Sequence, residues 1–453
     1  MSATTDITRL GAAALARAVQ ARELSCREVV DAALERIEAV DPSVNAVRVP
    51  LADEARAQAD RADARLAAGE PAGPLQGVPF TVKENVDVAG TATTHGVAAF
   101  AGNVAPADAP AIAHLRAAGA IPVGRANMGE LALRWHTQSA LGGATRNPRD
   151  PELTPGGSSG GDAVAVATGM APLGVGNDLG GSLRFPSQCC GTVAIRPSLG
   201  RVARASSLPP RDTPAGNQLM NVDGPLARSV ADLELALAVM SAPDPRDPWH
   251  VTAPLAGPPA PRRVAVMAPP DAHPDVQRAL KEAAGALAHA GYELTGEEPP
   301  RVAEAAELWA AIIADEVRAI WPAIGAVAGA EANAFVAAVL EAVPGPDGTR
   351  YAHALSERQA IAREWAEHTL ILAPICTAPP FKTGEDLGGP EAVQTLLERM
   401  RAVVAVNLLG LPAVAIHGIQ VIGPRLREDL CLEAAKAIEA AHGAPDPIDP
   451  QIT

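Results

Sequence analysis

The chain has 453 residues, of which 48% are hydrophobic and 20% charged, a composition that is typical of folded globular proteins and excludes a largely disordered chain. Its net charge of −15 and the lack of any Lys/Arg-rich run argue against nucleic acid as a partner. The longest apolar run, residues 163–175, is too short to cross a bilayer, and the first ten residues lack a signal-peptide core. We therefore expect a cytoplasmic protein with no membrane partner.

Helices are predicted for the first seventy residues. Apolar residues recur at helical spacing over residues 10–19 and 29–37, and Ser25 with Glu28 matches a capping box that would start the second helix. A third helix, rich in Ala and Arg, is expected over residues 51–68. We interpret these elements as a scaffold.

Short strands and helices alternate from residue 75 onward. Strands are predicted over residues 77–83, 121–123 and 194–195, and a helix is predicted over residues 109–118. This alternation indicates an α/β fold with at least some parallel strand pairing.

The second half of the chain begins with a proline-rich segment. Seven prolines between residues 242 and 263 predict a linker or a long surface connection. Beyond it we expect a strand over 263–267, a helix over 274–290 and mostly helical structure over 302–343. A final strand is predicted over 370–373, followed by a helical C-terminus.

The cysteines indicate neither a disulfide framework nor a zinc site, because their number is odd and no C-x-x-C spacing occurs. We expect them to be reduced, buried, small apolar side chains. They are Cys26, Cys189, Cys190, Cys376 and Cys431.

Two glycine-rich segments flank one helix-like apolar run. They read P-G-G-S-S-G-G-D over residues 155–162 and G-N-D-L-G-G-S-L-R over residues 176–184. Glycines let the backbone aim several N–H groups at one point, as phosphate-binding loops also do. Nucleotide binding is nevertheless disfavoured, because neither a P-loop nor a dinucleotide-binding motif is present.

A conventional Ser-His-Asp hydrolase is also disfavoured. Residues 157–161 match G-x-S-x-G with Ser159 at the centre, but no strand leads directly into them, and the scattered histidines nominate no base. No H-E-x-x-H motif indicates a metallohydrolase. A serine nucleophile with a lysine base remains, and Lys83 is the only lysine in the first half of the chain. Burial would make it a base by lowering its pKa, whereas a solvated surface lysine is the competing interpretation.

Several separated segments of the chain resemble, in sequence and in order, the motifs of the amidase signature enzymes. Strong similarity covers most of residues 75–202, and weaker similarity returns in the C-terminal part. The matching segments are residues 77–85, 124–130, 156–161, 178–186, 190–191, 196–197, 407–413 and 418–429. The resemblance implies an α/β fold with a twisted mixed β-sheet core surrounded by helices.

By the same resemblance, Lys83 is the catalytic lysine, Ser158 the bridging serine after a cis peptide, and Ser182 the nucleophile that forms the acyl-enzyme. Asp178, Arg184 and Ser159 would hold the two loops in register, although the spacing of Ser159 and Asp162 equally suits a helix cap. The implied oxyanion hole consists of the backbone N–H groups of Leu179, Gly180, Gly181 and Ser182.

The implied substrate is a small amide, ester or carbamate with an apolar or aromatic part, and no metal or other cofactor is expected. Met128, Gly129 and Trp135 would contact it, since they lie in a segment that borders the active site of the family. The helical stretch with Trp309 would form a second apolar wall or pack in the core. Four positions depart from the usual family pattern without removing a catalytic group: Glu84, Arg125, Asn177 and Leu179.

We expect one amidase domain over residues 1–453. Its parts would be a helical scaffold (1–70), the catalytic core (75–240), a variable pocket region (262–380) and a C-terminal return to the core (381–453). The sequence is compatible with a homodimer. The competing hypothesis is an amidotransferase-type subunit that works only in a complex, or a non-catalytic family member.

Overall fold

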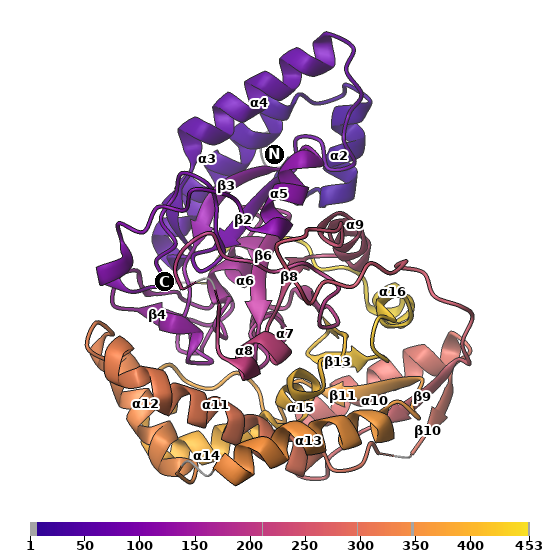
Figure 1. Cartoon of the computed structure of the whole chain (residues 1–453). Helices are drawn as coiled ribbons and strands as arrows, with labels where there is room; N and C mark the ends of the chain where they lie inside the picture. Colours follow the sequence, from indigo (N-terminus) through magenta and orange to yellow (C-terminus); the bar gives the residue numbers. More distant parts are fainter. Residues whose placement is uncertain (1–6, 211, 297, 346–347, 452–453) are drawn as a thin grey trace.

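One eleven-stranded sheet runs through the molecule, and its strands come from residues 47 to 422 (Figure 1). The computed structural model describes residues 7–210, 212–296, 298–345 and 348–451. Four strand pairs are parallel (β3–β2, β2–β6, β11–β9 and β9–β10), and the other pairs are antiparallel. The predicted α/β fold with a mixed sheet is confirmed.

The strands follow one another across the sheet in an order that differs from their order in the chain. That order is β1 (Val47–Pro50), β3 (Ile121–Ala126), β2 (Pro79–Lys83), β6 (Leu173–Asp178), β8 (Val222–Ala227), β7 (Val193–Arg196), β12 (Ala413–Ile416), β13 (Ile419–Ile422), β11 (Leu370–Pro374), β9 (Arg263–Val266) and β10 (Glu293–Thr295). A separate pair consists of β4 (Gln138–Ser139) and β5 (Gly143–Ala144).

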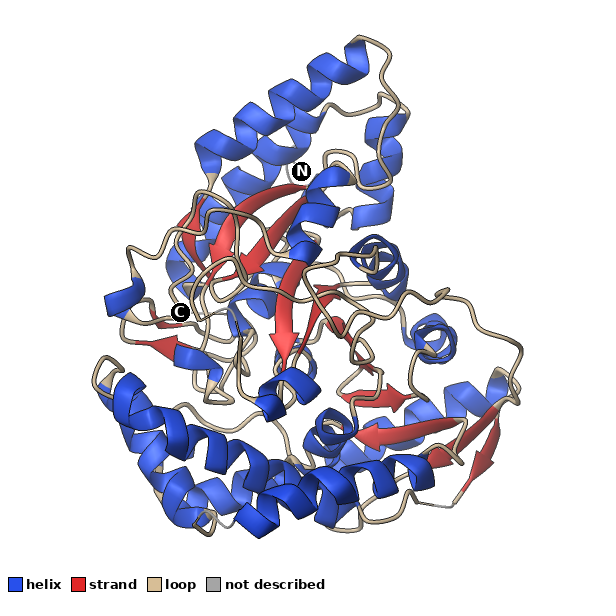
Figure 2. Ribbon diagram, viewed as in Figure 1, coloured by secondary structure: helices blue, strands red, loops and turns tan. Residues whose placement is uncertain are grey.

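Helices cover the sheet on both faces, as Figure 2 shows, so its central strands are buried at every position. The helices α6 (Gly160–Ala167) and α7 (Arg184–Cys190) pack against β6 and β12 respectively. The helices α9 (Val230–Met240) and α16 (Glu428–His442) pack against β8 and β12, and α10 (Pro274–His289) packs against β11.

The N-terminal helices lie at the upper end of the molecule in Figure 1 and agree closely with the prediction. They are α2 (Ala12–Gln20), α3 (Cys26–Val44) and α4 (Ala52–Ala67), followed by α5 (Pro110–Ala117). The Ser25 hydroxyl accepts from the Glu28 N–H, and the Glu28 carboxylate accepts from the Ser25 N–H. The capping box is therefore confirmed.

A second helical layer lies at the opposite end of the molecule (Figure 1). It contains α11 (Val302–Ile324), α12 (Ala330–Ala342), α13 (Gly348–Trp365), α14 (Pro390–Arg399) and α15 (Arg401–Leu409), with α8 (Ala215–Met220) against α11 and α15. Short 3₁₀ helices among the described residues are η1 (Ala98–Phe100), η2 (Glu130–Ala132) and η3 (Glu385–Leu387). The helices α11 and α12 cover most of residues 302–343, so the predicted helical character of this segment is confirmed. The long helix α11 packs against both α13 and α15.

The expectation of a final strand near residue 370 is wrong. The strand β11 is present, but β12 and β13 follow it and form a hairpin in the middle of the sheet. Its turn consists of His417 and Gly418, both at positive φ, as two-residue hairpin turns prefer. Because the hairpin is buried on both faces, its sequence lacks the polar alternation that would have revealed two strands.

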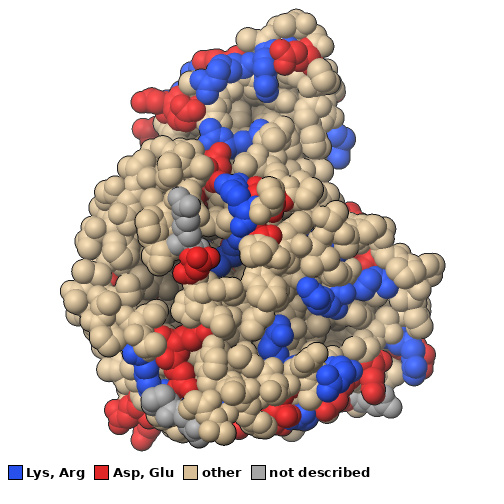
Figure 3. All heavy atoms as spheres, viewed as in Figure 1, with Lys and Arg blue, Asp and Glu red and all other residues tan. Residues whose placement is uncertain are grey.

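The five cysteines are free and buried, as predicted. Over the described ranges, none of the helices is both long and apolar enough to cross a membrane. On the face in Figure 3, positive and negative side chains lie next to one another at the top, in the middle and along the bottom, with wide uncharged areas beside them.

Candidate active site

Lys83 ends strand β2, which is buried along its whole length. The strands β2 and β6 are parallel, so Lys83 and Asp178 lie at the same edge of the sheet, where parallel strands of α/β proteins present their functional groups. The Lys83 side chain is fully buried and its Nζ donates to Ser158 Oγ at 2.8 Å and to Asn177 Oδ1 at 2.7 Å. Lys83 is therefore not a solvated surface lysine.

Burial lowers the pKa of Lys83 from 10.5 to about 7, because a charged ammonium loses its hydration in the protein interior. The carboxylates of Asp162, Asp178 and Asp223 oppose this shift, and Arg204 adds to it. A lysine with this pKa is partly a free amine at neutral pH and can accept a proton.

The first glycine-rich loop places Ser158 beside Lys83. The peptide between Gly157 and Ser158 is cis, which matches the expectation from the family resemblance. Its neighbours leave no room for side chains: a Cβ at Gly157 would lie 2.6 Å from the His136 backbone nitrogen, and one at Gly161 would lie 2.3 Å from the Asn127 oxygen. The glycines of this loop thus allow the backbone segments at Asn127 and His136 to come close to the segment that carries Ser158.

The second loop carries Ser182 and is joined to the first. The Ser159 N–H donates to the Ser182 oxygen at 3.3 Å, and the Ser159 hydroxyl donates to the Asn177 oxygen at the same distance. Ser159 occupies the N-cap position of α6, but its side chain accepts no capping hydrogen bond. The helix-cap interpretation of Ser159 is wrong, because its hydroxyl is turned toward the end of β6.

Asp178 and Arg184 form a fully buried ion pair that organises the second loop. Arg184 Nε and Nη2 donate to the two Asp178 oxygens, each at 3.0 Å. Asp178 also accepts from the N–H groups of Gly181 and Leu183 and from Asn407 Nδ2. Despite its burial, Asp178 has a pKa well below the ordinary range, because Arg184 stabilises its charge.

The expected oxyanion loop is held from its carbonyl side by two tryptophans. Trp309 Nε1 donates to the Leu179 oxygen at 2.9 Å, and Trp135 Nε1 donates to the Gly180 oxygen at 2.7 Å. The Gly181 N–H donates to Asp178 Oδ1 at 2.7 Å, so this expected oxyanion donor is not free. Within the described part of the chain, no acceptor meets the other three N–H groups, those of Leu179, Gly180 and Ser182.

The three residues expected to contact substrate lie around these loops. The Gly129 N–H donates to the Ser158 oxygen at 3.2 Å, and Met128 beside it is fully buried. Trp135 contacts the oxyanion loop through the hydrogen bond to Gly180. The structure thus brings Met128, Gly129 and Trp135 next to the segments that carry Ser158 and Ser182.

Four residues at this site have contacts that the sequence did not predict. Asn177 and Asn407 were visible as motif positions, but their contacts with Lys83 and Asp178 were not predictable. Asp162 is fully buried with Oδ1 bonded to the Thr81 hydroxyl at 2.8 Å and with Oδ2 unpaired. Burial raises the pKa of Asp162, and nearby Lys83 opposes that rise. Trp309 was expected only as a wall or as core.

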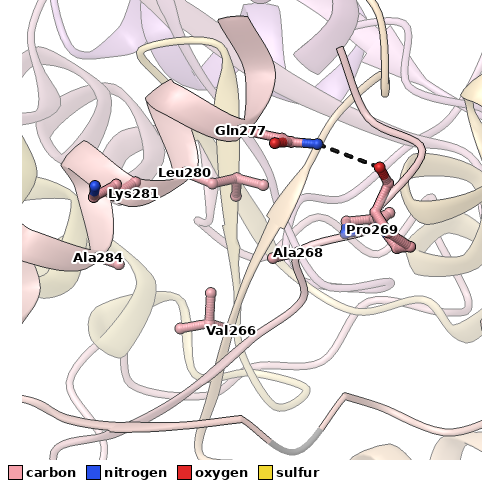
Figure 4. A pocket seen from close by; sticks show the side chains of 8 residues that line it. Val266, Ala268, Pro269, Gln277, Leu280, Lys281 and Ala284 are labelled. Atoms are coloured by element: carbon pink, nitrogen blue, oxygen red, sulfur yellow. Dashed lines mark hydrogen bonds between the residues drawn. The ribbon is translucent and has the colours of Figure 1, made fainter. Parts of the chain in front are cut away.

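A separate cavity of about 230 Å³ lies between β9 and α10 and includes none of the predicted site residues (Figure 4). It is lined by Val266, Ala268, Pro269, Pro270, Gln277, Leu280, Lys281 and Ala284. Among the described residues, no group of three or more His, Cys, Asp or Glu side chains is arranged to hold a metal ion.

The sequence and the fold of the chain are similar to those of known amide-hydrolysing proteins. A family model described as Amidase matches residues 28–432. The chain is 39% identical to an indoleacetamide hydrolase of Bradyrhizobium diazoefficiens, over 94% of this chain and 86% of that protein. It is 35% identical to one subunit of the glutamyl-tRNA(Gln) amidotransferase of Deinococcus radiodurans, over 95% of this chain and 96% of that protein. A solved 6-aminohexanoate cyclic dimer hydrolase has a TM-score of 0.84 and 27% identity, covering 98% of this chain and 99% of that one.

Proposed function

The chain belongs to the amidase family, whose enzymes hydrolyse carbon–nitrogen bonds, and from this premise we propose that it cleaves apolar aryl amides through an acyl-enzyme on Ser182. The observation that carries the proposal is the buried hydrogen bond between Lys83 and Ser158, next to the loop that presents Ser182. Such a lysine supplies a base without histidine.

In the proposed reaction, the neutral Lys83 amine takes a proton from the Ser158 hydroxyl, which takes one from Ser182 as Ser182 attacks the carbonyl carbon. The negative charge that develops on the carbonyl oxygen is stabilised by backbone N–H groups of the loop from Leu179 to Ser182. The Lys83 ammonium then returns its proton through Ser158 to the leaving amine as the C–N bond breaks. Water attacks the acyl-enzyme by the same relay and restores Ser182.

Apolar side chains around the nucleophile loop support an apolar substrate. A Cβ at Gly180 would touch the Trp309 ring, and one at Gly181 would lie 3.0 Å from Val403 and 3.6 Å from Met400. The Trp135 side chain contacts the same loop through its hydrogen bond to the Gly180 oxygen, and its ring centroid lies 6.2 Å from that of Trp309. The 39% identical relative is named an indoleacetamide hydrolase, so we propose aryl-substituted acetamides and aryl amides as the substrate class.

Ester and carbamate cleavage follows from the same proposal. Serine attack and oxyanion stabilisation act on the carbonyl group whichever atom leaves, so aryl esters and aryl carbamates that fit should react. Anilides with activated leaving groups should react faster than aliphatic primary amides, because their amine leaves more easily.

The competing function is that of a component that acts only within an amidotransferase complex. The similarity to an amidotransferase component over 95% of this chain is the observation that favours it. The purified chain, tested alone, separates the two functions. An autonomous amidase hydrolyses simple aryl amides, whereas a complex-dependent component requires its partners and prefers glutamine.

The test measures ammonia release from indole-3-acetamide and glutamine, nitroaniline release from a nitroanilide, and phenol release from an aryl ester and an aryl carbamate. Ser182→Ala, which should lack all turnover, is the control for contaminating hydrolases. We expect turnover of the aryl substrates by the wild-type chain. Hydrolysis of glutamine alone, with no reaction of the four aryl compounds, would contradict the proposed substrate class.

A further inference from the structure

We propose that Trp309 is a positioning residue that aims the N–H of Gly180 at the carbonyl oxygen of the substrate. This inference rests on the proposed function, because it assumes that the loop from Leu179 to Ser182 stabilises an oxyanion. Trp309 belongs to helix α11, 130 residues away from that loop in the sequence, and makes its hydrogen bond to the Leu179 oxygen at 2.9 Å.

The geometry of the peptide unit connects Trp309 to the Gly180 N–H. The Leu179 oxygen and the Gly180 nitrogen belong to one planar trans peptide, in which the C=O and N–H bonds point in opposite directions. An indole N–H bound to the oxygen therefore fixes the direction of the N–H on the other side. Within the described residues, this Gly180 N–H meets no protein acceptor.

The next peptide unit is held at both ends and provides an internal comparison. Its oxygen, that of Gly180, accepts from Trp135 Nε1 at 2.7 Å, and its N–H, that of Gly181, donates to Asp178 Oδ1 at 2.7 Å. Losing the Trp135 bond would leave this unit fixed by Asp178. Losing the Trp309 bond would leave the preceding unit, which carries a free donor, without a side-chain restraint.

Packing makes the restraint firm. Trp309 is 8% exposed and Trp135 is 7% exposed, and their rings lie 6.2 Å apart between centroids with 31° between their planes. A Cβ at Gly180 would come within 2.6 Å of the Trp309 ring, so the ring lies directly against the loop. Glu316, two turns further along α11, anchors that helix by accepting from the backbone N–H groups of Gly216 and Asn217.

A core-packing role alone makes a different prediction from a positioning role. If Trp309 only filled space, replacing it would lower stability and leave the catalytic rate of the folded enzyme unchanged. If it aims the Gly180 N–H, the rate falls even when the ring is preserved, because the donor is then less well aligned with the oxyanion.

The experiment compares Trp309→Phe with Trp135→Phe and Trp365→Phe in the full chain. Trp365 is the matched control, since it is 2% exposed and donates to the Pro300 oxygen at 2.8 Å rather than to the loop. Two readouts are used: kcat and KM on an aryl amide, and the rate at which an aryl phosphonofluoridate labels Ser182. The second readout works even if no amide substrate is found, so the two proposals can fail separately.

We expect Trp309→Phe to lower kcat and the labelling rate by about 10–100-fold, somewhat less than removal of an oxyanion donor, with KM changed less than about twofold. Trp135→Phe should have a smaller effect, and Trp365→Phe should stay within about twofold of wild type. If Trp309→Phe does not fold, a benzothiophene analogue of tryptophan at position 309, with sulfur in place of the N–H, keeps the ring shape. Wild-type rates in the folded Trp309 variant, or equal losses in the Trp365 variant, would overturn the inference.

Discussion

Lys83 Nζ lies 2.8 Å from Ser158 Oγ, although the two residues are 75 positions apart in the chain. Both side chains are fully buried. Burial disfavours the charged ammonium at this place, and in the proposed mechanism the pair acts as an amine and a hydroxyl that exchange a proton.

Removing the amine should therefore cost most of the activity. We expect Lys83→Ala to lower kcat/KM about 10²–10⁴-fold, because no other base contacts Ser158 among the described hydrogen bonds. Ser158→Ala should lose less, since a water molecule can replace a bridging hydroxyl more easily than a base. The measurement is steady-state hydrolysis of an aryl ester or amide. Lys436→Ala, which removes an exposed lysine paired with Glu234, serves as the control and should leave the rate unchanged.

The pH dependence should report the lysine. Since only the free amine accepts a proton, the rate should rise with pH as Lys83 loses its proton near pH 7. The Asp162 carboxylate favours the charged ammonium and so raises the pKa of Lys83, as Asp178 and Asp223 also do. Asp162→Asn should therefore move the rising limb of the kcat/KM profile to lower pH.

The control for this shift is Asp275→Asn, because Asp275 is half-exposed and pairs with Arg278 on helix α10. Its profile should coincide with that of wild type. An Asp162→Asn profile that is unchanged, or displaced to higher pH, would contradict the assignment of the limb to Lys83.

The ion pair between Asp178 and Arg184 should matter for stability. Arg184→Ala removes the cation that binds both oxygens of the fully buried Asp178 carboxylate and leaves it with Arg196 at 4.0 Å. Breaking a buried pair in this way typically lowers the free energy of unfolding by about 3–5 kcal/mol. The comparison is Arg262→Ala, whose partner Glu433 is half-exposed and which should cost no more than about 1 kcal/mol. Denaturant unfolding of both variants checks this difference, and equal losses would show that the buried pair has no special role.

The sequence nominated candidate catalytic residues, but it did not show which side chains surround them. Lys83, Ser158 and Ser182 lie in motifs whose residue types and order carry chemical information. The partners Asn177, Asn407 and Trp309 could not be predicted, because their contacts depend on how distant segments pack. Trp309 in particular reaches the loop only because α11 packs against α15 and α8.

Two predictions that rested on local sequence patterns were wrong. The hairpin of β12 and β13 was missed, since strands buried on both faces show no polar alternation. The spacing of Ser159 and Asp162 suited a helix cap, yet the Ser159 hydroxyl bonds to the Asn177 oxygen and the Asp162 carboxylate to Thr81. In both places tertiary contacts outweighed the local preference.

The most direct test of the account identifies the residue that forms the covalent intermediate. The purified chain is incubated with an activated aryl ester, quenched in acid and digested, and the acylated peptide is located by mass spectrometry. We predict an acyl group on Ser182 in the wild-type chain and none in Ser182→Ala. Acylation of Ser158 or Ser159 with Ser182 unmodified would contradict it.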